Sequence, residues 1–271
     1  MTEEKKAWLS ELIESLTIED VERMKGATET LAKGLPEDSD AEAVAADVEA
    51  RVTALEDLLD LVENYDNAKD LQAIGGLGPL LKTLDTGHPR LVAAAAEVVT
   101  AMVQNHPRCQ RWVFEAGALD LLLRKFVGAT SPRARAKVVS AVSSLTRHYP
   151  DAYVAFIKAG GLESLLAPAL LQSTTDEPAC VRKAAMFLRH MLFSPDVGGY
   201  AKAWVAGRMG DVIGALVRGL TAEDVGVVEN CMVCLHYFVH DTYNEIFDNH
   251  SKWDVDVHRT RVPLKEPTPS G

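Results

Sequence analysis

Apolar residues recur at helical spacing along two long stretches of this chain. They are Val92, Ala95, Val99, Met102 and Val103 in the first stretch, and Val138, Ala141, Val142 and Leu145 in the second. Steps of three and four residues place such side chains on one face of a helix. The apolar face is wide, which is typical of a helix that neighbouring helices cover on both sides.

A glycine-led pattern precedes these stretches and recurs at a regular interval. Its three clear copies are Ile74–Leu81, Ala116–Leu123 and Ala159–Leu166. The first glycines of the copies, Gly75, Gly117 and Gly160, lie 42 and 43 residues apart. A weaker fourth copy, Met209–Leu216, follows after 50 residues.

Prolines keep the same interval. Pro89, Pro132 and Pro178 lie 43 and 46 residues apart, and each precedes a long helical pattern. Proline is tolerated at the first helical position because its missing N–H would be unpaired there. A second set, Pro107, Pro150 and Pro195, lies 43 and 45 residues apart, where we expect proline to end those helices. A helical repeat with a period in the low forties is typical of armadillo or HEAT units.

The predicted fold is all-α: a right-handed α-solenoid of armadillo-like repeats with a helical N-terminal cap. We expect each unit to pair a short helix, such as residues 119–127, with a longer one, such as 132–148. A further long helix is expected over 48–64, and a last one over about 222–240, where Thr221 and Asp224 resemble a capping box.

The predicted organisation has three parts. Residues 1–40 form the N-terminal cap and an acidic linker, with one amphipathic helix or two short ones between residues 8 and 35. Residues 41–249 form the repeat domain, with about 4–5 repeats at the period seen above. Residues 250–271 carry three prolines and little apolar periodicity, so we expect a flexible tail.

Charge and composition narrow the partner classes. The formal net charge is -11 and no basic stripe is visible, which argues against nucleic acid. An acidic surface suits a partner with basic patches. No apolar run approaches the roughly 20 residues that span a bilayer, so no membrane partner is expected. The first six residues lack the apolar core of a signal peptide, and we expect a cytoplasmic, monomeric protein.

Two motifs resemble a metal site and a phosphate-binding loop, but a structural role explains each of them better. Cys231 and Cys234, followed by His236 and His240, resemble zinc ligands, but they lie within a predicted helix, where cysteines are usually small buried apolar residues. The glycine cluster at 75–78 lacks the Gly-Lys-Ser/Thr of a phosphate loop. No catalytic constellation is evident, and we expect no enzyme activity, no cofactor and no metal.

One segment resembles a known family, the armadillo-type nucleotide exchange factors of 70-kDa heat-shock chaperones. The segment Leu58–Ala68 is similar to the end of that family's first long helix, with its Glu-Asn-x-Asp-Asn-Ala motif. Ala101–Asn105 resembles its second-repeat ending. Arg135, Lys137, Ala141, Leu145 and Arg147 resemble its third-repeat helix. The resemblance runs from about residue 50 to 240, and the final repeat departs most from the pattern.

The resemblance implies a function and a mechanism. Family members curve around one lobe of the chaperone's ATPase domain and displace it, so that ADP leaves. By the repeat register, the partner-binding residues would lie on the concave face in two rows, Asn64, Asn105, His148 and Ser194 at the helix ends and Asp60, Ala101, Ser144 and His190 one turn earlier.

Two alternatives stay open. Asn64 and Asn105 are either partner contacts or residues that cap helix ends. The whole chain is either an exchange factor or a general armadillo scaffold for a peptide or another protein. Peptide-binding armadillo grooves carry Trp and Asn ladders on their concave helices, whereas Trp112 and Trp204 fall outside the predicted long helices.

Overall fold

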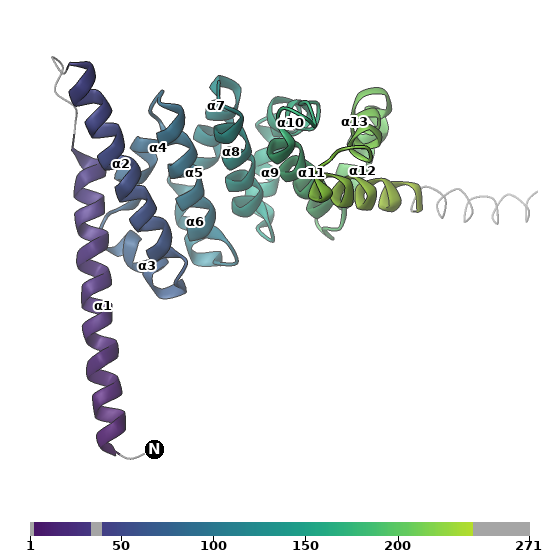
Figure 1. Ribbon diagram of the computed structural model, residues 1–271. Coiled ribbons are helices and arrows are strands. Elements are labelled where there is room, and N and C mark those ends of the chain that lie inside the picture. Colours follow the sequence, from purple (N-terminus) through teal and green to yellow (C-terminus); the bar gives the residue numbers. More distant parts are fainter. Residues whose placement is uncertain (1–2, 34–39, 241–271) are drawn as a thin grey trace, which may run out of the picture.

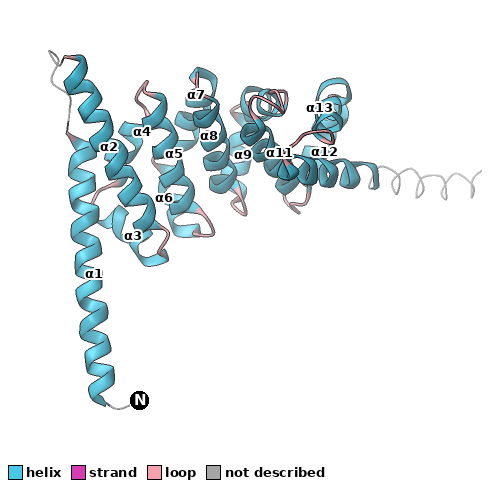
Figure 2. Cartoon of the chain, in the orientation of Figure 1, coloured by secondary structure: helices cyan, strands magenta, loops and turns pink. Residues whose placement is uncertain are grey.

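Every regular element in residues 3–33 and 40–240, the ranges that the computed structural model describes, is helical (Figure 2). The helices lie side by side along one axis, from α1 at one end to α13 at the other (Figure 1). The predicted all-α solenoid is confirmed. In chain order the elements are α1 (Glu3–Ala32), α2 (Ala41–Val62), α3 (Tyr65–Ala73), α4 (Leu77–Leu84), α5 (Pro89–Val103), α6 (Pro107–Glu115), α7 (Ala118–Gly128), α8 (Pro132–Thr146), α9 (Pro150–Lys158), the π-helical turn η1 (Leu162–Leu166), α10 (Ala167–Leu170), α11 (Pro178–Leu192), α12 (Gly198–Gly207), the π-helical turn η2 (Met209–Ile213), α13 (Gly214–Gly219) and a last helix over Val225–His240.

Each repeat contains three helices, not the expected pair. Pro107 and Pro150 do follow the long helices, but they occupy the first turn of α6 and α9. Proline is as well suited to beginning a helix as to ending one. The repeats are therefore α3 to α5, α6 to α8, α9 to α11, and α12 to the helix over Val225–His240.

Local capping moves several expected boundaries. Helix α2 begins at Ala41 because the Asp40 carboxylate accepts a hydrogen bond from the Ala43 amide at 2.8 Å. The last helix begins at Val225, three residues later than expected, because Asp224 rather than Thr221 caps it and accepts from the Val227 amide at 3.0 Å. Acidic and amide side chains favour this position because they satisfy free helical N–H groups.

The recurrent glycines are explained by backbone geometry. Gly75, Gly117 and Gly160 have φ values of 79°, 78° and 70°, in the left-handed region that glycine enters without strain. The weaker fourth copy differs, since Gly210 lies inside the π-helical turn η2. The glycine repeat therefore marks a turn, which accounts for the cluster at 75–78 without phosphate binding.

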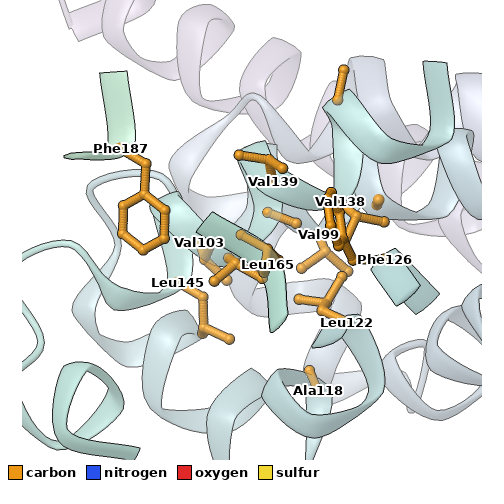
Figure 3. Close-up of a cluster of buried hydrophobic side chains, with 14 of the residues drawn as sticks. Val99, Val103, Ala118, Leu122, Phe126, Val138, Val139, Leu145, Leu165 and Phe187 are labelled. Atoms are coloured by element: carbon orange, nitrogen blue, oxygen red, sulfur yellow. The ribbon is translucent and has the colours of Figure 1, made fainter. Parts of the chain in front are cut away.

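The third helices of successive repeats, together with α2, which precedes the first repeat, form the spine of the molecule. Helix α2 packs on α5, α5 on α8, and α8 on α11. Figure 3 shows buried side chains from several of these repeats meeting in one cluster, among them Val99, Val138 and Leu122. Burying a side chain of this size contributes about 1.5–3 kcal/mol, so the stacking of repeats stabilises each unit.

Of the two possibilities for the N-terminal region, the structure has one long helix, α1, which reaches beyond the repeats at one end (Figure 1). It packs on α2, α3 and α4. The guanidinium of Arg51 on α2, only 8% exposed, donates to the Leu31 carbonyl at 3.3 Å and is paired with Asp47. Residues 34–39, which include most of the linker expected over 36–40, and the expected tail, 250–271, lie outside the described residues.

Among the described helices, none is by itself both long enough and apolar enough to cross a membrane. The segments Pro150–Lys158 and Leu162–Leu170 reach the length and apolarity of a membrane span only when they are taken together, and the chain bends by 75° between them.

Candidate partner-binding surface

The third helices and α2, which packs in the same row, present a shared surface. We call it the third-helix face, and it consists of the exposed sides of α2, α5, α8, α11 and the helix over Val225–His240. Ion pairs cross it at the repeat period, between residues 40–42 apart in sequence, and they are Arg90–Glu49, Lys137–Glu97, Arg135–Glu177 and Arg182–Asp224. The pair Arg90–Glu49 is exposed and contributes little to stability, whereas Arg135–Glu177 is partly buried. The main consequence of the ion pairs is that four cations and four carboxylates of the face are bound to one another across helices.

A pocket of about 250 Å³ brings together three of the predicted site residues. Asn105, Ser144 and His148 line it together with Gln104, Pro107, Gln110 and Arg147. The pocket lies where the ends of α5 and α8 meet the start of α6. The repeat register predicted this grouping, because corresponding positions of adjacent third helices are neighbours.

The other predicted residues do not line that pocket, although His190 lies close to two residues that do, Arg147 and His148. Asp60 is exposed on α2, whereas Ala101 is half-buried on α5. His190 is half-buried on α11, close enough to Arg147 and His148 for their charges to lower its pKa. Burial is the larger cause, and it brings that pKa to about 4.

Ser194 has a local structural role in the turn after α11. Its hydroxyl oxygen accepts a hydrogen bond from the Asp196 amide at 3.3 Å. This turn differs from the corresponding turns after α5 and α8, because those two contain a residue in the left-handed conformation and this one does not. Ser194 is therefore not the geometric equivalent of Asn105 and His148.

Asn64 and Asn105 have different roles in the backbone. The Asn64 side-chain oxygen accepts from the Asp66 amide at 3.0 Å, so Asn64 caps the start of α3 and not the end of α2. Asn105 has φ 55°, and the corresponding His148 has φ 56°. Both asparagine side chains are exposed, so a partner contact remains compatible with either structural role.

The rest of the Glu-Asn-x-Asp-Asn-Ala motif joins neighbouring helices. Asn67, 5% exposed, donates its amide to a carboxylate oxygen of Asp20 on α1 at 2.9 Å. Ala68 is buried, and its carbonyl accepts from the Cys109 thiol on α6. The motif is thus a junction between α1, the first repeat and the second.

The cysteines have the properties of buried apolar residues. All four are free and buried, and burial raises the pKa of Cys109 to about 11 and that of Cys180 to about 12. Burial also raises the pKa of Cys231 and of Cys234. Within the described residues, no three His, Cys, Asp or Glu side chains gather closely enough to hold a metal ion.

The two tryptophans of the repeats in the described residues lie outside the third helices. Trp112 is on α6 and Trp204 is on α12, and both are half-buried. The indole N–H of Trp204 donates to Glu163 at 2.7 Å. A Trp ladder of the peptide-binding kind is therefore absent from the described part of the third-helix face.

Comparison with solved structures supports the armadillo architecture. A computationally designed armadillo repeat protein for modular peptide recognition matches with a TM-score of 0.56 and 18% identity, over 79% of this chain and 91% of that one. A designed armadillo repeat protein in complex with the peptide (KR)4 matches with a TM-score of 0.55 and 18% sequence identity. At this identity the likeness establishes the fold alone.

Curated relatives are more similar in sequence. The nucleotide exchange factor SIL1 of Rattus norvegicus is 36% identical over 138 residues, 51% of this chain and 29% of its own length. Human Hsp70-binding protein 1 is 32% identical over 170 residues, which cover 61% of this chain and 47% of the relative. The Hsp70 nucleotide exchange factor FES1 of Eremothecium gossypii is 32% identical over 145 residues, which cover 52% of this chain and 49% of the relative. The matched segment spans less than half of each relative.

Two family models match consecutive parts of the chain. The model "Nucleotide exchange factor Fes1" matches residues 1–71, which include α1, α2 and the junction motif. The model "SIL1/FES1/HPBP1 C-terminal domain" matches residues 67–195, which include the repeats up to α11. Together with the armadillo architecture, these matches show that the chain belongs to the SIL1/FES1/HPBP1 family.

Proposed function

We propose that the chain is a co-chaperone that binds the ATPase domain of a 70-kDa heat-shock chaperone and promotes the release of ADP. The observation that carries the proposal is the pair of family models covering residues 1–195. Three relatives whose names describe nucleotide exchange or Hsp70 binding support it. The proposal assigns no catalytic step to this chain.

The physical basis is differential affinity. A binding protein moves a conformational equilibrium only as far as it prefers one state over the other. Converting a mostly closed ATPase domain to a mostly open one requires a preference of about 10⁴-fold. A stack of repeats whose neighbouring third helices pack closely and share ion pairs suits this task, because it resists deforming to fit the closed state.

The third-helix face is the proposed docking surface. It carries the pocket that Asn105, Ser144 and His148 share, and the half-buried His190 lies beside it. We further propose that the protein acts as a monomer in the cytoplasm, on neither nucleic acid nor a membrane. Four free thiols that are all buried are compatible with a reducing compartment.

The test is nucleotide release from a purified 70-kDa chaperone loaded with labelled ADP. We expect the full chain to accelerate release, and to bind the isolated ATPase domain more weakly when ADP is present. The variant Ser144→Arg, which fills the pocket on the third-helix face, should lose the acceleration. The matched control Val154→Arg places the same side chain at an exposed position on α9 and should retain it. No acceleration at saturating wild-type protein would contradict the proposed function.

A further inference from the structure

The third-helix face has a strongly basic centre, although the whole chain carries a formal net charge of -11. Helices α8 and α11 supply its cations, counting the residue that ends α8. They are Arg133, Arg135, Lys137, Arg147, Arg182, Lys183 and Arg189. Of these, Arg135, Lys137 and Arg182 are paired with a carboxylate. By contrast, α2 at one end of the same face exposes Glu56 and Asp60. The face therefore changes sign along the solenoid.

Lys183 is a half-buried cation without an acidic partner. The structure gives it no hydrogen bond or ion pair among the described residues. Burial lowers its pKa, and the charges of Arg182, Lys137 and Arg147 lower it further. The single carboxylate that acts on it, Glu97, is already bound to Lys137. Half-buried cations are normally paired, because desolvation without a partner destabilises the folded protein.

Arg147, at the end of α8, also lacks an acidic partner in the described part of the chain. Its guanidinium is half-buried, its Nε has no hydrogen-bond acceptor, and burial lowers its pKa. Two hydroxyls of α8 between Lys137 and Arg147, those of Ser140 and Ser143, are also buried without a partner. Lys183 and Arg147, two cations without an acidic partner among the described residues, thus lie close together where α8 and α11 adjoin.

We propose that this basic cluster, centred on Lys183 and Arg147, binds a carboxylate-bearing segment of the chaperone's ATPase domain. The inference rests on the proposed function and names the chemistry of the docking contact. A partner carboxylate would supply the charge that the folded chain lacks, and in a desolvated contact such a pair is stronger than at an open surface. The acidic surface of α2 would repel the same segment, so the change of sign orients the partner along the solenoid.

A carboxylate-bearing partner segment differs from the expectation drawn from net charge, which is a partner with basic patches. That expectation treats the surface as uniform, whereas the ion pairs between repeats neutralise charge unevenly. Glu49, Glu97, Glu177 and Asp224 are each bound to a cation of the neighbouring repeat. Lys183 and Arg147 receive no such partner and remain available.

The experiment measures binding of the isolated ATPase domain to the full chain and to Lys183→Met, which keeps the aliphatic stem and removes the charge. We expect Kd to rise about 10-fold, the size typical of one charge pair, and to depend less steeply on salt than in the wild type. The thermal midpoint should stay the same or rise, because an unpaired half-buried charge is removed. The matched control is Lys158→Met on α9, an exposed lysine for which binding should not change.

Each other outcome overturns the inference in a distinguishable way. If the wild type does not bind the ATPase domain, the proposed function fails together with the inference. If the wild type binds and Lys183→Met binds equally well, only the inference fails. A thermal midpoint that falls along with affinity would indicate a structural role for Lys183. A rise in the wild-type midpoint with millimolar inorganic phosphate, absent from Lys183→Met, would indicate a site for a free anion instead.

Discussion

The side-chain amide of Gln110 on α6 donates a hydrogen bond to the backbone carbonyl of Arg147, at the end of α8, over 2.9 Å. The same nitrogen lies 2.9 Å from the Ser144 carbonyl and 3.4 Å from that of Leu145. The last carbonyls of a helix have no partner within the helix. Gln110, only 4% exposed, therefore closes the end of a helix in its own repeat from 34–37 residues away in sequence.

Replacing Gln110 with Leu should destabilise the protein by about 1–3 kcal/mol, because buried carbonyls lose their donor. Chemical unfolding followed by circular dichroism measures the loss. Gln104→Leu is the control, since Gln104 is exposed, and its stability should stay close to that of the wild type. Equal stability of Gln110→Leu and wild type would show that water replaces the side chain without cost.

Replacing Asn64 with Ala should reduce stability by about 1 kcal/mol, the usual cost of losing an N-cap. Asn64→Ser keeps an oxygen that can accept from the Asp66 amide, so it should retain most of the stability. The pair also separates the two roles of Asn64. Loss of chaperone binding in both variants identifies a contact, whereas loss in neither leaves the cap as the sole role.

Replacing Asn105 with glycine tests whether its side chain contacts the chaperone. Asn105→Gly removes the side chain but keeps the left-handed backbone at φ 55°, so its thermal midpoint should stay near that of the wild type. Asn105→Ala should cost about 1 kcal/mol, because Cβ disfavours that conformation. If the side chain contacts the chaperone, both variants bind the ATPase domain more weakly. Tight binding by Asn105→Gly would rule out that contact.

His190 predicts a pH dependence with a definite sign. Its ordinary pKa of 6.5 is lowered to about 4 in the folded protein by burial, aided by the positive charges of Arg147, Arg189 and His148. As pH falls, the unfolded chain takes up this proton first. The contribution of His190 to stability is therefore complete above about pH 6.5 and declines between pH 6.5 and 4. His190→Gln should lose less stability over that interval in parallel unfolding titrations. Identical slopes would contradict the assignment.

The buried thiols should be unreactive in the native protein. Burial raises the pKa of Cys180 to about 12 and of Cys231 to about 11, so almost no thiolate is present near neutral pH. Labelling with a thiol reagent at pH 7.5 should proceed only as fast as the protein unfolds, and all four thiols should react in denaturant. Rapid labelling of one thiol in the native state would reveal a local opening of its repeat.

Much of this architecture is determined by the amino-acid sequence through local rules. Proline at the start of a helix, glycine at a positive φ and apolar residues three and four positions apart each depend on near neighbours in the chain. Their common period aligned the repeats and placed Asn105, Ser144 and His148 in one pocket. The same local rules did not decide whether Pro107 ends one helix or begins the next, since proline is compatible with both positions.

Tertiary structure decided what depends on residues brought together from distant parts of the chain. No pattern near Gln110 marks it as the cap of α8, because the carbonyls that it binds belong to a distant part of the chain. Nor does the sequence separate Lys183 from Lys137, which occupies the corresponding position one repeat earlier. Glu97 of the preceding repeat binds Lys137 and leaves Lys183 unpaired, because the distances between side chains on packed helices determine which charges are neutralised.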